Sequence, residues 1–269
     1  MSLSASRLQR LLQEAPVPFH MDHYISRGIQ FMNQNFGMLL AFFLVSTMIS
    51  FFIQIIPVAG LVAGLLITPV LQIGYAQFVY ATERENRSDF GEFFKGFNKI
   101  GPLVATYLLT IVLSILALLP GLLLWFQAGM LDWFMGLMEE YPSIEELPDP
   151  LQLVDNGLFW LGLLLIFVGG LLASSLLAWS LYIAWFFEVG PLEALNASRM
   201  LIARNWFSFI IFLLLVGLIS VSGALLCGVG LLYTIPAMAC AQFFAFAEAT
   251  RLFEADTDQP QDITDHFIA

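Results

Sequence analysis

All ten lysine and arginine residues of this chain lie in alternate gaps between long apolar segments. Four parts of the chain contain them: the part before the first apolar segment, residues 83–99, residues 188–205, and the part after the last segment. The ten residues are Arg7, Arg10, Arg27, Arg84, Arg87, Lys95, Lys99, Arg199, Arg204 and Arg251. Lysine and arginine near the ends of membrane spans are retained in the cytoplasm during insertion. The pattern therefore predicts six spans with both termini in the cytoplasm.

The composition agrees with a membrane protein. Hydrophobic residues make up 59% of the chain and charged residues 12%, whereas soluble proteins average roughly 45–50% and about 25%. The predicted spans are Phe36–Ile56, Val58–Ala81, Pro102–Leu119, Leu158–Phe187, Trp206–Ala224 and Cys227–Ala247. Each has about the 18 residues or more that a spanning helix needs. We therefore expect an all-α membrane protein with six transmembrane helices. The first and second spans, and the fifth and sixth, should form tight hairpins.

The acidic residues are also unevenly placed, within a net charge of −11. Residues 127–156 form a predicted extracytoplasmic loop, and residues 252–269 form a polar cytoplasmic tail. The segment Pro120–Leu131 is apolar enough to extend the third helix or to lie in the membrane interface. The acidic residues of the loop are Asp132, Glu139, Glu140, Glu145, Glu146, Asp149 and Asp155. Neither face favours nucleic acid, so we expect no nucleic-acid partner.

The hairpins contain an internal repeat. The second span contains Thr-Pro and then Ala-Gln-Phe, and the sixth contains Thr-Ile-Pro and then Ala-Gln-Phe. In each, the glutamine (Gln77 or Gln242) lies six residues before a glutamate (Glu83 or Glu248). The fourth span keeps the end of the pattern, with Tyr182 six residues before Glu188, but it lacks the proline and the Ala-Gln-Phe. The middle copy has therefore diverged most.

Each copy also begins with a short amphipathic segment. In the middle copy, Phe90, Phe93, Phe94 and Phe97 recur at the spacing that gives one apolar helical face. The segments Tyr24–Gln34 and Leu192–Arg204 occupy the equivalent places. We therefore expect a single membrane domain over residues 1–269. It should contain three parallel repeats, at about residues 20–83, 88–188 and 190–250. Each repeat would be a cytoplasmic in-plane amphipathic helix followed by a transmembrane hairpin.

Three glutamates at the inner ends of the even spans are candidate binding residues. Glu83, Glu188 and Glu248 could surround one cytoplasmic vestibule that binds a cation or a polar head group. Alternatively, each glutamate marks the water interface and helps to start the following helix, because carboxylates at span ends cost little. The sequence leaves both interpretations open.

Four uncharged polar residues within the spans are the other candidates. Gln77 and Gln242, with Thr68 and Thr234 beside their prolines, could line a polar cavity. They could equally serve packing, because threonine satisfies carbonyl groups freed by proline and glutamine bonds across helices.

No signature of catalysis or metal binding stands out. His20 and His23 lie close together, but a metal site needs more ligands, so we expect no metal. The six predicted spans contain no charged residue, which argues against an ion-coupled pump. No nucleotide-binding loop, zinc-protease helix or serine elbow occurs. We therefore expect neither a cofactor nor a catalytic residue.

Two stretches near the C-terminus carry a family resemblance. They are Glu188–Asn205, which includes Gly-Pro-Leu-Glu-Ala-Leu-Asn-Ala-Ser-Arg, and Cys227–Pro236. They resemble a group of uncharacterised bacterial polytopic integral membrane proteins and the membrane domain of some glycerophosphodiester phosphodiesterases. The resemblance implies a bacterial inner-membrane location. It carries over no catalytic residue, because the phosphodiesterase chemistry belongs to a separate soluble domain.

Together these observations predict a non-enzymatic inner-membrane protein that binds or moves a lipid or amphiphilic solute at the cytoplasmic leaflet. Its partners would be membrane lipids and other membrane proteins. One alternative is a membrane scaffold or assembly factor. Another is an intramembrane enzyme, for which only the three glutamates offer suitable groups. A polar route through the protein would favour transport, whereas a sealed core would favour a scaffold.

Overall fold

The structure is a computed structural model that describes residues 5–15, 17–136, 155–225 and 228–254. Over these ranges the chain forms helices and no strand, and six helical segments are long and apolar enough to cross a membrane. The protein is therefore an all-helical, multi-pass membrane protein, as the sequence predicts. The helices are α1 (Ala5–Gln13), α2 (Met21–Gln34), α3 (Phe36–Gln54), α4 (Pro57–Glu85), η1 (Phe90–Lys99), α5 (Ile100–Gln127), α6 (Met130–Gly136), α8 (Gly157–Leu176), α9 (Ser180–Phe186), α10 (Pro191–Ala203), α11 (Trp206–Ser222), η3 (Gly223–Leu225) and α12 (Leu231–Ala249).

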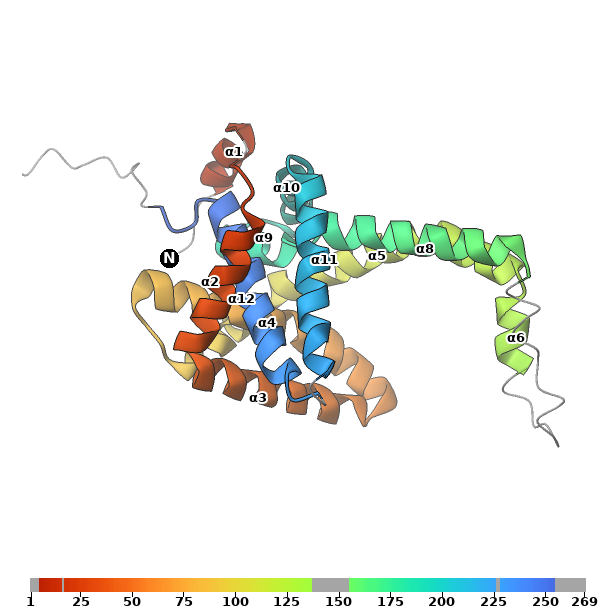
Figure 1. Ribbon diagram of the computed structural model, residues 1–269, viewed down its shortest axis with the longest axis horizontal. Helices are drawn as coiled ribbons and strands as arrows, with labels where there is room; N and C mark the ends of the chain where they lie inside the picture. The colour runs from red at the N-terminus through yellow and green to blue at the C-terminus, as the bar shows by residue number, and fades with distance from the viewer. Residues whose placement is uncertain (1–4, 16, 137–154, 226–227, 255–269) are drawn as a thin grey trace, which may run out of the picture.

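The spanning segments pair into three hairpins, α3 with α4, α5 with α8, and α11 with α12. Ile55 and Ile56 join α3 to α4, and α4 begins with Pro57, where the missing N–H breaks no helical hydrogen bond. Gly228 adopts a left-handed φ of 80° in the turn before α12. Figure 1 shows that the α5–α8 hairpin projects away from the other two. Both tight hairpins that the sequence predicts are present.

Small residues let α5 and α8 approach closely. A Cβ atom on Gly121 would lie 2.7 Å from the carbonyl oxygen of Gly162, and one on Gly169 would lie 2.4 Å from that of Ala117. Such sites allow two membrane helices to pack backbone against backbone. α5 also continues through Pro120 as one helix to Gln127, so the third span does extend past this proline, and the separate helix α6 begins at Met130.

The fourth span is broken, which the sequence does not predict. α8 ends at Leu176 and α9 begins at Ser180. The hydroxyl of Ser198, on α10, accepts a hydrogen bond from the Trp179 N–H (3.2 Å) and donates one to the Leu176 carbonyl (2.9 Å). This hydroxyl satisfies backbone groups that the break exposes, and a membrane segment needs such satisfaction. No proline marks the site, and Ser180 of the same span also bonds the Leu177 carbonyl (2.8 Å).

The three short segments that precede the odd spans each pack on an even span. α2 packs against α12, η1 against α4, and α10 against α9. The contact is close at Gly28 of α2, where a Cβ atom would lie 2.6 Å from the carbonyl oxygen of Ala237 and 2.7 Å from the Cβ of Ala241. These segments are therefore held by protein contacts on one side.

The phenylalanine-rich segment η1 differs from the α-helix that its spacing predicts, because it is a 3₁₀-helix. Phe93 is fully buried, and its ring stacks on Phe42 and on Phe78 with centroids 4.2 Å apart in both cases. Phe97, in contrast, is 43% exposed. Part of the apolar face of η1 is thus buried in the protein, and the rest is exposed.

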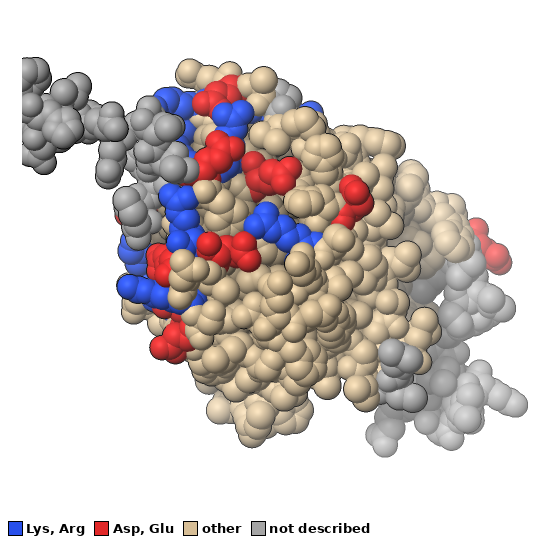
Figure 2. All heavy atoms as spheres, turned by 60° about the vertical axis from the view of Figure 1, so that its left-hand side comes forward, with Lys and Arg blue, Asp and Glu red and all other residues tan. Residues whose placement is uncertain are grey.

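Charged side chains gather over one end of the molecule, and most of the surface beyond them carries no charge (Figure 2). We call this end the charged face. The ion pairs there include Arg27–Glu83, Lys99–Glu188 and Arg251–Glu14. The buried aromatic core lies just beneath it, where α2, α4, α9 and α12 meet. The acidic residues from Glu139 to Asp149 and the tail from residue 255 lie outside the described residues.

Candidate functional site: a polar cavity between the hairpins

A cavity of about 630 Å³ lies among the spanning helices α3, α4, α9, α11 and α12. All three hairpins contribute to it, since α9 completes the span that begins with α8. Its polar lining residues are Ser46, Thr47, Ser50, Thr68, Gln72, Tyr75, Tyr182, Ser220 and Gln242. Ligand sites usually occupy roughly 300–1,000 Å³. The cavity is thus large enough for a small molecule or for part of a lipid.

Several polar groups of this cavity lack a partner. The side-chain amides of Gln72 and Gln242 make no hydrogen bond with another described residue. The Tyr75 hydroxyl lies near the Ser46 side chain, but it is buried without a hydrogen bond among the described residues. An unsatisfied polar group in hydrocarbon costs several kcal/mol. Water or a ligand in the cavity would satisfy these groups.

The serine hydroxyls of the cavity behave differently. Ser50 donates to the Ser46 carbonyl (2.9 Å), and Ser220 donates to the Val216 carbonyl (2.7 Å), each within its own helix. Such bonds satisfy the hydroxyl hydrogen and leave the oxygen able to accept. The serines therefore offer acceptors, whereas the amides of Gln72 and Gln242 offer both donors and acceptors.

None of the residues that line the cavity is an acid, a base, a histidine or a cysteine. General acid–base chemistry needs a group that ionises near the working pH. Over the described ranges, no three His, Cys, Asp or Glu side chains gather as a metal site would require. The lining thus suits hydrogen bonding and apolar contact.

A second cavity of about 460 Å³ adjoins the first along the α3–α4 hairpin. Ser50, Thr68 and Leu71 line both. The second cavity continues to Gly60 and Gly64, close to the turn between the two helices. The two cavities therefore share part of their wall, and the second lies nearer the hairpin turn and has fewer polar residues in its lining.

The four polar residues predicted within the spans separate into two pairs. Thr68 and Gln242 line the cavity. Gln77 is only 6% exposed, and its Oε1 accepts a hydrogen bond of 2.6 Å from Trp185 Nε1. The hydroxyl of Thr234 bonds the carbonyls of Ser220 (2.9 Å) and Gly230 (3.2 Å), which ties α12 to α11. The cavity interpretation fits the first pair and the packing interpretation fits the second.

The three predicted glutamates each have a different partner on the charged face. Glu83 pairs with Arg27 (2.9 Å), Glu188 pairs with Lys99, and Glu248 accepts a hydrogen bond of 3.0 Å from the Tyr24 hydroxyl. The first and last of these lie outside the polar cavity. Glu188 lines a separate cavity of about 240 Å³.

Glu188 also occupies a different position in its span from the other two glutamates. It adopts a left-handed φ of 53° just after α9. In the other two even spans, Asn86 and Arg251 hold the left-handed position, with φ values of 52° and 48°. Each of these follows its glutamate, Glu83 or Glu248, by three residues. Glu188 therefore matches Asn86 and Arg251 in backbone position.

Four polar residues of the cavity are not among the residues predicted from the sequence, namely Gln72 and Tyr75 on α4 and Ser46 and Ser50 on α3. A signal for them exists, because polar residues recur every three or four positions along both helices and so share one face. The internal repeat does not mark these four residues, because they belong to the first unit alone.

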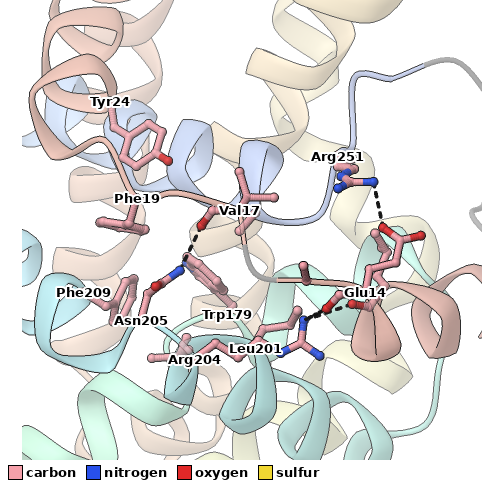
Figure 3. A pocket seen from close by; sticks show the side chains of 14 residues that line it. Glu14, Val17, Phe19, Tyr24, Trp179, Leu201, Arg204, Asn205, Phe209 and Arg251 are labelled. Atoms are coloured by element: carbon pink, nitrogen blue, oxygen red, sulfur yellow. Dashed lines mark hydrogen bonds and ion pairs between the residues drawn. The ribbon is translucent and has the colours of Figure 1, made fainter.

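A smaller pocket lies beneath the N-terminal helix α1 (Figure 3). The Arg204 guanidinium donates to the carbonyls of Leu11, Leu12 and Glu14, at the C-terminal end of α1. These carbonyls have no helical partner, and a cation is favourable there. Arg251 pairs with Glu14 at 2.7 Å.

The volume of this pocket is only about 30 Å³, so its residues mainly connect neighbouring helices. Asn205 donates to the Val17 carbonyl (2.9 Å), which fixes the chain between α1 and α2. Burial raises the pKa of Tyr24 above its usual value, so the hydroxyl stays protonated and donates to Glu248. A cavity of this size holds about one water molecule.

No protein family model, curated protein or solved structure matches this chain. The candidate site therefore stands on its geometry.

Proposed function

We propose that this protein is a non-enzymatic membrane protein that binds or moves a lipid or another amphiphilic solute in the polar cavity between its hairpins. The observation that carries the proposal is the set of unpaired polar groups there. Gln72, Tyr75 and Gln242 lie on otherwise apolar spans and face a cavity of about 630 Å³. A bound molecule with polar groups would satisfy them and offset their desolvation.

We also propose a bacterial inner-membrane location with both termini in the cytoplasm, because the basic residues favour that orientation. The charged face would then lie at the cytoplasmic surface. Gln242 precedes Glu248 by six residues, which places it roughly 9 Å deeper along α12. An amphiphile of the cytoplasmic leaflet could therefore reach the cavity with its polar part just beneath the charged face.

We infer that the chain consists of three repeated units arranged in a ring. Cyclic packing supports this, since α2, η1 and α10 each pack on the even span of the preceding unit, with α2 closing the ring on α12. Small residues at equivalent places also support it. Gly28 lies seven residues before Asn35, Ser198 lies seven before Asn205, and both contact the adjacent even span.

A scaffold function is the second candidate, and the α5–α8 hairpin favours it. This hairpin projects from the rest of the molecule (Figure 1), and its outer residues Leu116, Leu164 and Phe167 are 56%, 55% and 62% exposed. Lipid can cover such a surface, and so can another membrane protein. An intramembrane enzyme is less well supported, because the residues lining the cavity include no Asp, Glu, His, Lys, Arg or Cys.

Native mass spectrometry of gently solubilised protein tests the proposal. We expect an amphiphile of defined mass on the wild-type protein. It should be lost from the double variant Gln72→Leu/Gln242→Leu, which removes both unpaired amides. The triple variant Glu83→Gln/Glu188→Gln/Glu248→Gln serves as the control and should keep the ligand.

Equal retention of the amphiphile by the glutamine double variant would overturn the proposed site. A co-purifying membrane protein without bound amphiphile would instead favour the scaffold.

A further inference from the structure

We propose that the ligand is an amphiphile with an uncharged polar part, of the diacylglycerol type, whose hydrocarbon chain lies along the α3–α4 hairpin. This inference rests on the proposed function and specifies its ligand class. It follows from three properties of the site: the absence of charge in its lining, the hydrogen-bonding groups beneath the charged face, and the apolar continuation toward the hairpin turn.

The lining excludes a charged head group. No residue that lines the polar cavity or its continuation is an acid or a base. A phosphate or ammonium group placed among the spans without an opposite charge would lose its hydration and gain no ion pair. The ionic partners that the structure does provide, such as Arg27 and Lys99, lie on the charged face and are already paired with glutamates.

The polar end of the cavity fits hydroxyl and ester groups. Tyr182 lies six residues before Glu188, and Tyr75 lies eight before Glu83, which places them roughly 9 and 12 Å below the ends of their spans. Together with Gln242 they offer donors and acceptors at one depth. A diacylglycerol has one free hydroxyl, which donates and accepts hydrogen bonds, and two ester carbonyls, which accept them. It presents these groups without a charge, and the donors and acceptors of the cavity match them.

The apolar end fits a hydrocarbon chain. The continuation of about 460 Å³ is lined by Ile53, Leu61, Leu65, Ile67 and Leu71, besides its few polar residues. It leads away from the charged face toward the turn between α3 and α4. An amphiphile with its polar part near Gln242 would direct its chain along this path, as a lipid of the leaflet at the charged face does.

Gly64 gives a way to block this path. A Cβ atom on Gly64 would meet only Ile53 Cγ2, at 3.9 Å, so the backbone tolerates a side chain there. Gly64→Leu should therefore fill the continuation without breaking the hairpin. Gly217 on α11 is a matched control, because a Cβ atom there meets nothing within 4 Å and the residue lines neither cavity.

The test uses the full chain in phosphatidylcholine nanodiscs with a diacylglycerol that carries a photoreactive diazirine in one acyl chain. We expect the probe to label α3 and α4. We also expect 1,2-dioleoylglycerol to compete with the probe at a concentration at least roughly tenfold lower than dioleoyl phosphatidic acid needs. The two competitors have the same chains and differ only in the phosphate. The wild type should prefer dioleoylglycerol, with its longer chains, over dioctanoylglycerol. Gly64→Leu should abolish this preference, and Gly217→Leu should keep it.

Each part of the proposal can fail separately. Equal competition by phosphatidic acid would overturn the uncharged head group while leaving amphiphile binding intact. An unchanged chain-length preference in Gly64→Leu, with normal thermal unfolding, would overturn the placement of the chain. Labelling that is the same in wild type and in Gln72→Leu/Gln242→Leu would overturn the proposed function as well.

Discussion

Gln77 and Gln242 are the middle residues of two copies of the triplet Ala-Gln-Phe, yet their side chains have different surroundings. Gln77 is buried and accepts a hydrogen bond from Trp185, whereas Gln242 lines the polar cavity and makes no hydrogen bond with a described residue. The sequence identified both residues as polar groups within spans. It could not separate them, because the difference depends on which neighbouring helix each one meets.

Replacing each glutamine by leucine should therefore have opposite effects. Gln77→Leu leaves the Trp185 N–H without its acceptor, which should lower the free energy of unfolding by about 1–3 kcal/mol. Gln242→Leu removes an unpaired amide and should leave stability unchanged or raise it. Thermal unfolding of both variants in one detergent measures the difference. A larger loss of stability in Gln242→Leu would show that its amide has a structural partner.

Ser198 is the second residue whose role only the structure reveals, because its hydroxyl satisfies both sides of the break between α8 and α9. Ser198→Ala should cost about 1–3 kcal/mol of stability, since it leaves a buried N–H and a buried carbonyl unpaired. Ser174→Ala is the control, because Ser174 is exposed and bonds only its own helix at Leu171. Chemical denaturation compares them, and equal stabilities would contradict the role of Ser198.

The N-terminal helix α1 is held by side chains from distant elements. Arg204 at the end of α10 donates to its last carbonyls, and Arg251 after α12 pairs with Glu14. Isolated helices of this length are marginal in water. These two arginines therefore help to attach α1, together with Leu8 and Leu11, which are buried in the core.

Arg204→Gln should release α1 from the charged face. We expect faster trypsin cleavage after Arg7 and Arg10 than in the wild type, because the released helix unfolds readily. Arg199→Gln is the matched control, since Arg199 bonds only Asn196 on its own helix. Cleavage at wild-type rates in Arg204→Gln, measured by mass spectrometry of the N-terminal fragments, would show that other contacts hold α1.

The elements themselves were largely predictable. The six spans and both tight hairpins follow from run length and from the prolines and glycines at the turns. The break at Leu177 and the 3₁₀ form of η1 were not predictable. Contacts with Ser198 and with Phe42 and Phe78 accompany them, and such contacts belong to tertiary structure.

The arrangement of the whole molecule was predictable only in part. The distribution of lysine and arginine indicated that alternate gaps share one side, and charged residues do gather on one face (Figure 2). The cavity, however, forms where the polar faces of α3, α4, α9, α11 and α12 meet. Which faces meet depends on the rotation of each helix, and apolar spans carry only a weak periodic signal for it.

A high-resolution map of the full chain in nanodiscs, prepared with the lipids that co-purify with it, would decide whether the polar cavity is occupied. We expect elongated density between Tyr75 and Gln242, continuing past Thr68 toward Gly64, because the unpaired groups there need a partner. A cavity closed by its own side chains, with the amides of Gln72 and Gln242 bonded within the protein, would contradict the proposal that this protein binds an amphiphile there.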